Sequence, residues 1–121
     1  MTFDPAERVR LYFAAIEAID FEAIEAFYAD NATYVSNGVG SLSGRQEIMA
    51  AIHRYFRDYP DQTSDTKSIE RLTPLSARAV WSVRATHADT GKPLIREGEE
   101  TITFDEDGRV TSVEVTDYRP F

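Results

Sequence analysis

The stretch Tyr12-Phe13-Ala14-Ala15-Ile16-Glu17-Ala18-Ile19-Asp20-Phe21 sets the start of the fold. Its apolar residues recur at spacings of three and four, which is typical of an amphipathic helix. Upstream, Asp4-Pro5 supplies a capping acid and a proline suited to the first helical turn, so we expect this helix to begin there. Asp20 is predicted to cap a second helix over 21–29.

The following segments predict a short strand, a loop and a third helix. Phe27-Tyr28-Ala29-Asp30-Asn31-Ala32-Thr33-Tyr34-Val35 leads into a strand over 32–35. Ser36-Asn37-Gly38-Val39-Gly40-Ser41 is glycine-rich enough to suggest a mobile loop, and whether residues 37–41 form a lid stays open. Ser43 is predicted to cap a helix over 44–58. The buried ridge of that helix consists of Ile48, Ile52, Phe56 and Tyr59.

From Thr63 onward the hydrophobic period changes to two, which predicts strands. Turn signals at Pro74, Thr90-Gly91 and Asp107-Gly108 divide them into 63–73, 77–88, 94–105 and 109–118. Helices followed by strands predict an α+β class, with the helices packed in the concave face of a strongly curved, mostly antiparallel sheet. A length of 121 residues with 42% hydrophobic content predicts a single domain over 1–121.

The charge and residue composition of the chain limits the classes of partner and cofactor that we expect. Thirteen Lys and Arg against 21 Asp and Glu give a net charge of −8, which repels phosphate backbones and anionic membrane surfaces, so neither nucleic acid nor membrane is an expected partner. The sequence holds no cysteine and no histidine pair at metal-ligand spacing, so we expect neither metal nor cofactor. Met1-Thr2-Phe3-Asp4-Pro5 lacks the pattern of a signal peptide, and a cytoplasmic location is predicted.

Strand alternation divides the sheet residues into an inward and an outward set. The more apolar, inward set consists of Trp81, Val83, Ala85 and His87, then Leu94, Arg96, Gly98, Glu100, Ile102 and Phe104, then Val113, Val115 and Asp117. A two-residue turn at Thr90-Gly91 would place Trp81 opposite Glu100 and His87 opposite Leu94. Val80, Ile95 and Val110 are assigned to the outward face.

The inward set contains candidate catalytic groups. Buried charges are costly unless paired, and carboxyls in an apolar pocket have raised pKa values, so Glu100 and Asp117 are candidate general acids or bases. Two alternatives stay open: one or more of these groups lie at the open rim of the sheet, or Arg96 simply pairs with Glu100 or Asp117. Tyr12 is either a core residue with a satisfied hydroxyl or a donor to a developing oxyanion.

The apolar inward residues either fill the core or line a ligand pocket. The candidate substrate-binding residues are Phe13, Ile16, Tyr34, Trp81, Val83, Arg96, Ile102 and Val115. His53 and His87 are interpreted as surface or structural residues.

The order of these elements, with an acidic breaker before the first strand and the helix entry Gly44-Arg45, resembles the nuclear transport factor 2-like superfamily. This superfamily includes the SnoaL-like polyketide cyclases and the ketosteroid isomerases. The resemblance covers Val9 to Tyr118 and implies a cone-shaped, cystatin-like fold in which helices close one end of the sheet and leave a deep pocket.

The resemblance also implies roles for single residues. Tyr12, within Tyr-x-Ala-Ala, falls where the isomerases hold their oxyanion-stabilising tyrosine, and Glu100 falls where they hold a protonated second donor. The position of their base holds Ser36, which cannot accept a proton from carbon unaided. In the similar epoxide hydrolases an arginine stands two residues before an aspartate, whereas Arg96 is followed at that spacing by Gly98. Asp117 lies in a closing strand similar to theirs.

Two functions are therefore expected as alternatives. One is a cofactor-free isomerase, cyclase or lyase, or an epoxide-hydrolase-like enzyme, that acts on a small apolar or aromatic compound. In it Glu100 or Asp117 moves the proton and Tyr12 stabilises negative charge on oxygen. The other is a non-catalytic ligand-binding or dimerisation module. A homodimer formed through the outward sheet face is expected in both cases.

Overall fold

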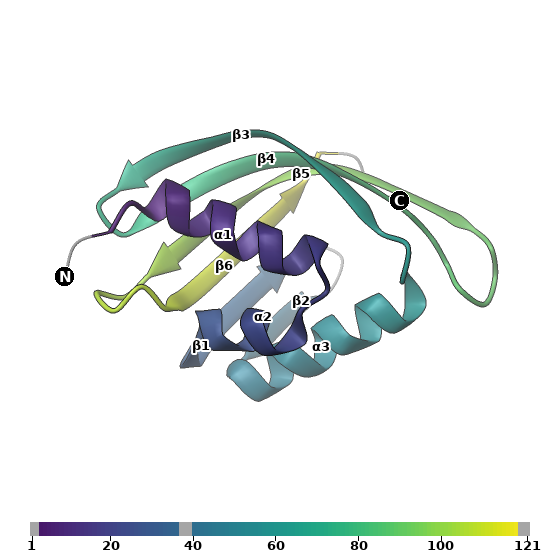
Figure 1. Ribbon diagram of the computed structural model, residues 1–121, viewed down its shortest axis with the longest axis horizontal. Helices are drawn as coiled ribbons and strands as arrows, with labels where there is room; N and C mark the ends of the chain where they lie inside the picture. The colour runs from purple at the N-terminus through teal and green to yellow at the C-terminus, as the bar shows by residue number, and fades with distance from the viewer. Residues whose placement is uncertain (1–2, 37–39, 119–121) are drawn as a thin grey trace.

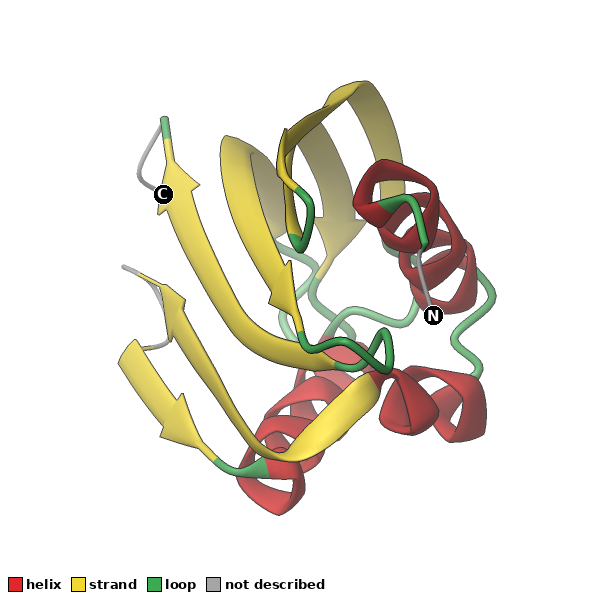
Figure 2. Cartoon of the chain, turned by 90° about the vertical axis from the view of Figure 1, so that its left-hand side faces the viewer, coloured by secondary structure: helices red, strands yellow, loops and turns green. Residues whose placement is uncertain are grey.

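Three helices lie inside a strongly curved sheet (Figures 1 and 2). The computed structural model describes residues 3–36 and 40–118. The helices are α1 (Pro5–Glu17), α2 (Phe21–Phe27) and α3 (Arg45–Asp58). The strands are β1 (Tyr28–Ser36), β2 (Gly40–Ser43), β3 (Thr63–Thr73), β4 (Ser76–Thr86), β5 (Pro93–Phe104) and β6 (Val110–Asp117). The predicted α+β class, with helices in the concave face of the sheet, is confirmed.

The strands form one sheet in the order β2-β1-β6-β5-β4-β3. All neighbouring pairs are antiparallel except β1 and β6, which run parallel, so the predicted mostly antiparallel sheet is confirmed. β6 is the last strand in sequence, yet it lies between β1 and β5 in the middle of the sheet. Among the described residues, no helix is long and apolar enough to cross a membrane.

The first two helices begin as predicted. Asp4 accepts a hydrogen bond from the backbone N–H of Ala6 at 3.0 Å, and Asp20 accepts one from Ala23 at 3.1 Å. The predicted cap of the third helix is wrong. Gly44 occupies the N-cap position with φ of 92°, and no side chain caps the helix. The positive φ, which glycine adopts without strain, turns the chain directly from β2 into α3.

The region between α2 and α3 contains more strand than predicted. α2 ends at Phe27 and β1 begins at Tyr28, because pairing with β6 draws the chain into the sheet four residues before the predicted start at Ala32. Gly40 and Ser41 were assigned to a loop but belong to β2, where Gly40 pairs with Ser36. Residues 37–39 of the predicted loop lie outside the described part of the chain.

The predicted register between β4 and β5 is wrong by two residues. Trp81 pairs with Gly98, and Leu94 pairs with Ala85. The connection is longer than a two-residue turn, since the backbone N–H of His87 donates to Lys92 at 2.9 Å and that of Gly91 donates to His87. A shift of two keeps every side chain on its face. The inward assignments of Trp81 and Val83 are therefore confirmed by their burial.

Val110 is a core residue with no exposed surface, not an outward residue as predicted. A bulge explains the difference: Val110 pairs with Phe104, whereas Ser112 pairs with Thr103, so the register shifts between these two pairs. An extra residue in one strand reverses the alternation on its far side. Val113 and Val115, beyond the bulge, face inward as predicted and are buried.

Gly98 lies at a close approach between β5 and β6. A Cβ atom on this residue would lie 2.5 Å from the carbonyl oxygen of Thr116 and 3.2 Å from the Cα of Asp117. Real Cβ atoms do not approach backbone atoms so closely, so only glycine fits this backbone. The inner face of β5 consequently has no side chain opposite Trp81.

Candidate functional site

A cavity of about 150 Å³ lies between the inner face of the sheet, α1 and α3. Most of the predicted site residues line it. They are Tyr12, Phe13, Ile16, Tyr34, Trp81, Val83, Arg96 and Glu100. Ile102 and Val115 lie in the buried core and not on the cavity wall. Asp117 contacts the cavity only through Arg96, with which it forms an ion pair.

Sequence reasoning missed part of the wall. Tyr55 and Ala51 on α3 line the cavity beside the predicted ridge residues Ile52 and Phe56. The two edge strands add Ser64 and Thr66 on β3 and Leu42 on β2, and Gln62, just before β3, also lines the cavity. A signal existed for Tyr55, because it lies three residues after Ile52 and four after Ala51, on the same face of the helix. No signal existed for Ser64 and Thr66, whose polar side chains look like solvent-facing residues of an edge strand.

The carboxyl group of Glu100 is the acid of the cavity wall. Burial raises its pKa from an ordinary 4.5 to about 7, whereas the nearby guanidinium of Arg96 and the indole N–H of Trp81 lower it. Burial dominates because removing a carboxylate from water disfavours its charged form. Near neutral pH, Glu100 is thus divided between a proton-donating and a proton-accepting state.

Tyrosine hydroxyls surround this acid. Tyr12 and Tyr28 share a short hydrogen bond between their hydroxyl oxygens. Burial raises the pKa of Tyr12 well above its ordinary value, and Tyr28 and Glu100 raise it further. Burial and Glu100 also raise the pKa of Tyr34. These phenols are therefore neutral hydrogen-bond donors at any physiological pH.

Arg96 and Asp117 form a buried ion pair on adjacent strands. The guanidinium Nη2 lies 3.1 Å from Oδ1 of Asp117, and the two side chains are 15% and 5% exposed. The Arg96 Nε also donates to the same oxygen, at 3.2 Å. Burial lowers the pKa of Arg96, but Asp117 and the nearby tyrosines more than compensate, so the pKa is raised and the guanidinium stays charged. Of the two interpretations left open for Arg96, pairing with Asp117 is the one observed.

Three buried polar atoms near the cavity find no hydrogen-bond partner of good geometry among the described residues. They are the Tyr55 hydroxyl, the Trp81 indole nitrogen and Oδ2 of Asp117. The Tyr55 hydroxyl lies near Arg96 and the Trp81 N–H lies near Glu100, so each has a charged neighbour although neither forms a well-aligned hydrogen bond. Two of them, Tyr55 and Trp81, belong to residues that line the cavity.

The histidines lie apart from this site. The ring of His87 packs 5.3 Å from that of Tyr59, and its Nδ1 accepts hydrogen bonds from the backbone of Asp89 and Thr90. His53 stacks on Phe21, with 4.0 Å between the ring centroids. Within 3–36 and 40–118, no cluster of three His, Asp or Glu side chains could hold a metal ion.

The sequence pattern of the SnoaL-like domain matches residues 9–113. The chain belongs to this family. The match includes both helices and strands of the cavity wall, so it also confirms the resemblance drawn from the order of the elements. No curated protein matches the chain.

Solved structures with the same fold extend the comparison. An NTF2-like protein of unknown function from Exiguobacterium sp. 255-15 is 18% identical, with a TM-score of 0.81 over 93% of this chain and 99% of that one. A Mycobacterium tuberculosis protein in complex with estradiol-17beta-hemisuccinate is 16% identical, with a TM-score of 0.83 over 98% and 96%. SalBIII, described as an epoxide hydrolase/cyclase-like enzyme, is 17% identical, with a TM-score of 0.81 over 92% and 88%. At these identities the likeness establishes the NTF2-like fold.

Proposed function

We propose that this SnoaL-like protein binds a small apolar carbonyl compound in its cavity and moves a proton at the carbon next to the carbonyl group. The observation that carries the proposal is the carboxyl of Glu100, whose pKa of about 7 lies near neutrality in a wall formed mostly by aromatic and aliphatic side chains. An acid or base works best when its pKa is close to the working pH.

The chemistry follows from the placement of the donors. A carbonyl oxygen beside Tyr12 accepts a hydrogen bond from its neutral phenol. The carboxylate form of Glu100 takes the proton from the carbon next to the carbonyl, the electron pair of the broken C–H bond moves onto the carbonyl oxygen, and the hydrogen bond from Tyr12 strengthens. Return of the proton from Glu100 to a different carbon completes an isomerisation.

The size of the cavity limits the ligand. About 150 Å³ is the volume of an engineered apolar protein cavity that binds benzene. Substrate pockets for drug-sized molecules are larger, roughly 300–1,000 Å³. We therefore propose a ligand of one small ring or a short chain. The relatives support a small-molecule role: one is solved with an estradiol derivative and another is a cyclase-like enzyme.

Hydrogen exchange tests this proposal without knowledge of the natural substrate. The probe is cyclohexanone in D₂O, and NMR measures the rate at which deuterium replaces hydrogen next to the carbonyl. We expect the wild-type protein to accelerate exchange and Glu100→Gln to reduce that acceleration by about 100-fold, the lower end of the typical effect of losing a general acid or base. Equal rates for both proteins would rule out this role of Glu100.

The control variant is Glu114→Gln, which removes an exposed carboxylate from β6, outside the cavity. Its exchange rate should match that of the wild type. A drop as large as that of Glu100→Gln would show a general charge effect and contradict the assignment.

A second candidate function is ligand binding without turnover. Ser36, which is buried and only 4% exposed, stands where related isomerases hold their base. Gly98 stands where the acid of an epoxide-hydrolase-like triad would be, which weakens that alternative. Chemical-shift changes on addition of cyclohexanone, with no acceleration of exchange, would favour a binding protein.

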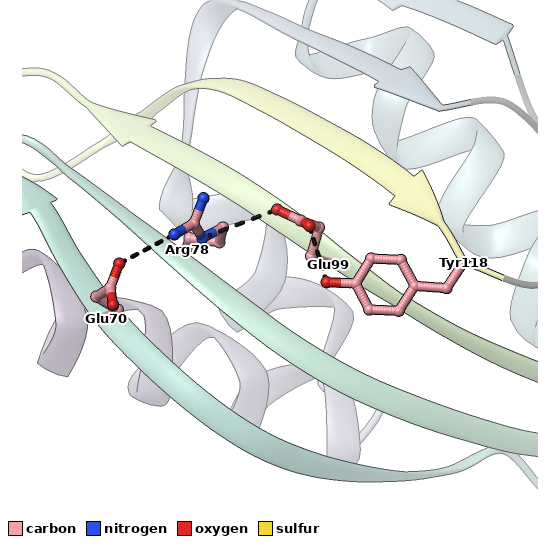
Figure 3. A network of polar contacts seen from close by, with 4 residues as sticks. All are labelled: Glu70, Arg78, Glu99 and Tyr118. Atoms are coloured by element: carbon pink, nitrogen blue, oxygen red, sulfur yellow. Dashed lines mark hydrogen bonds and ion pairs between the residues drawn. The ribbon is translucent and has the colours of Figure 1, made fainter.

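We also propose a homodimer formed through the outward sheet face. Figure 3 shows polar contacts that cross this face: Arg78 lies 3.0 Å from Glu70 and 3.8 Å from Glu99, which accepts from the Tyr118 hydroxyl at 2.8 Å. Around them, Val35, Ile95 and Tyr118 are 46%, 46% and 54% exposed. Such a mixed surface suits self-complementary packing.

Analytical ultracentrifugation tests the dimer. We expect a dimer at micromolar concentration and a shift toward monomer in Ile95→Arg, which would place two like charges in the interface. The control is Leu11→Arg on α1, an exposed apolar residue away from the sheet, which should leave the dimer intact. A wild-type protein that sediments only as a monomer would refute the proposal.

A further inference from the structure

Trp81 stands between the cation and the acid of the cavity wall. Its direct partner across β4 and β5 is Gly98, and the inward neighbours of Gly98 on β5 are Arg96 and Glu100. Inward residues of one strand are spaced by two positions, so these two side chains leave the sheet on either side of the glycine. Gly98 contributes no side chain between them, and Trp81 lies across from it on β4.

The indole stacks with Arg96 and influences Glu100. The guanidinium carbon of Arg96 lies 5.1 Å from the centroid of the Trp81 ring, a cation–π distance. The indole N–H also lies close enough to Glu100 to lower the pKa of its carboxyl group. Among the described residues, the ion pair of Arg96 is with Asp117, which lies across from Gly98 on β6.

We propose that Trp81 is a positioning residue that separates the guanidinium of Arg96 from the carboxyl of Glu100. It directs Arg96 to Asp117 and keeps Glu100 able to donate a proton. This inference depends on the proposed function for its purpose, but the arrangement of the three side chains stands without it.

The consequence of such a separation is large. An arginine in direct contact with a carboxyl lowers its pKa by about 1–3 units, enough to convert Glu100 into a permanent carboxylate at neutral pH. The other titratable groups facing Glu100 are Tyr12 on α1 and Tyr28 and Tyr34 on β1. These phenols are neutral, so Arg96 is the nearby cation whose position decides the charge of Glu100.

Two substitutions at Trp81 distinguish the effect of its aromatic bulk from the effect of its indole N–H. The measurement is the pKa of Glu100, followed through its side-chain carboxyl carbon by NMR. Trp81→Phe keeps an aromatic barrier and removes the donor, so the pKa should stay at about 7 or rise. Trp81→Leu removes the barrier, and the pKa should fall by about one unit or more as Arg96 reaches the acid. Trp81→Met provides the same comparison where the leucine variant does not fold.

Better hydration of Glu100 in the leucine variant would also lower the pKa of this carboxyl. The same substitution is therefore also measured in a protein that lacks Arg96. In Arg96→Met/Asp117→Asn, which removes both charges of the pair, Trp81→Leu should cause no comparable fall. A fall that persists without Arg96, or no fall in the original background, would overturn the proposal. The titration uses no substrate. It can therefore contradict the role of Trp81 while the exchange experiment supports the proposed function, and it can support the role of Trp81 while the exchange experiment contradicts that function.

Discussion

Arg96→Met is expected to lower the free energy of unfolding by about 3–5 kcal/mol, the usual cost of removing one partner of a buried ion pair. The substitution leaves the Asp117 carboxylate, whose side chain is only 5% exposed, without its opposite charge. The methionine side chain fills similar space, so the loss is electrostatic and not a cavity effect. Urea unfolding, with a constant dependence on denaturant, measures the change.

Two control variants sharpen this result. Arg96→Met/Asp117→Asn should recover most of the lost free energy, because no uncompensated charge remains in the interior. Lys67→Met breaks an ion pair in which the side chains of Lys67 and Asp65 are 55% and 69% exposed. This substitution should change the free energy of unfolding by less than about 1 kcal/mol. A single variant no less stable than the double variant would contradict the account of the buried pair.

Rising pH is expected to destabilise the protein through Glu100. Its pKa is about 7 in the folded chain and 4.5 in the ordinary, solvated state. Between these values the folded protein holds a proton that the unfolded chain has released, so the free energy of unfolding falls as the pH rises. The contribution of Glu100 is fully present below pH 4.5 and is lost by the time the pH exceeds 7. The total loss is about 3 kcal/mol, because a pKa difference of one corresponds to about 1.4 kcal/mol.

Glu100→Gln isolates this contribution, since glutamine stays neutral at every pH. The difference in unfolding free energy between the wild type and Glu100→Gln should move by about 3 kcal/mol in favour of the variant between pH 4.5 and pH 7.5. The exposed control Glu114→Gln should show almost no such change. A flat difference for Glu100→Gln would mean that this carboxyl is solvated, which would also remove the main support for the proposed function.

The face of the sheet on which each side chain lies could be predicted from sequence, because it depends only on whether residues are separated by an even or an odd number of positions. The β4–β5 register was wrong by two residues, yet Trp81, Arg96 and Glu100 were still assigned to the correct side. Val110 was assigned to the wrong side because the bulge between Thr103 and Phe104 adds one residue, and no turn signal marks it. A register error of two residues leaves every side chain on its predicted face, whereas an error of one residue moves it to the other face.

The acid and the tyrosine of the cavity wall could be predicted from sequence, but the cavity residues on the edge strands could not. Glu100 and Tyr12 stood out as polar residues at inward positions, and both line the cavity. Ser64 and Thr66 on β3 were missed, because a bulge near Thr66 and the curvature of the sheet decide which edge residues reach the cavity. The pairing of Arg96 with Asp117 was left open, since sequence alone cannot show that Trp81 occupies the space beside Arg96.

The place of β6 in the sheet has a consequence for biosynthesis. A nascent chain that has been synthesised as far as Phe104 contains β1 and β5, but the strand that joins them in the sheet has not yet been made. The carboxylate partner of Arg96 is also still missing, because Asp117 is the last residue of β6. β1 and β5 therefore come together only after β6 has been synthesised, when this strand of eight residues inserts between them.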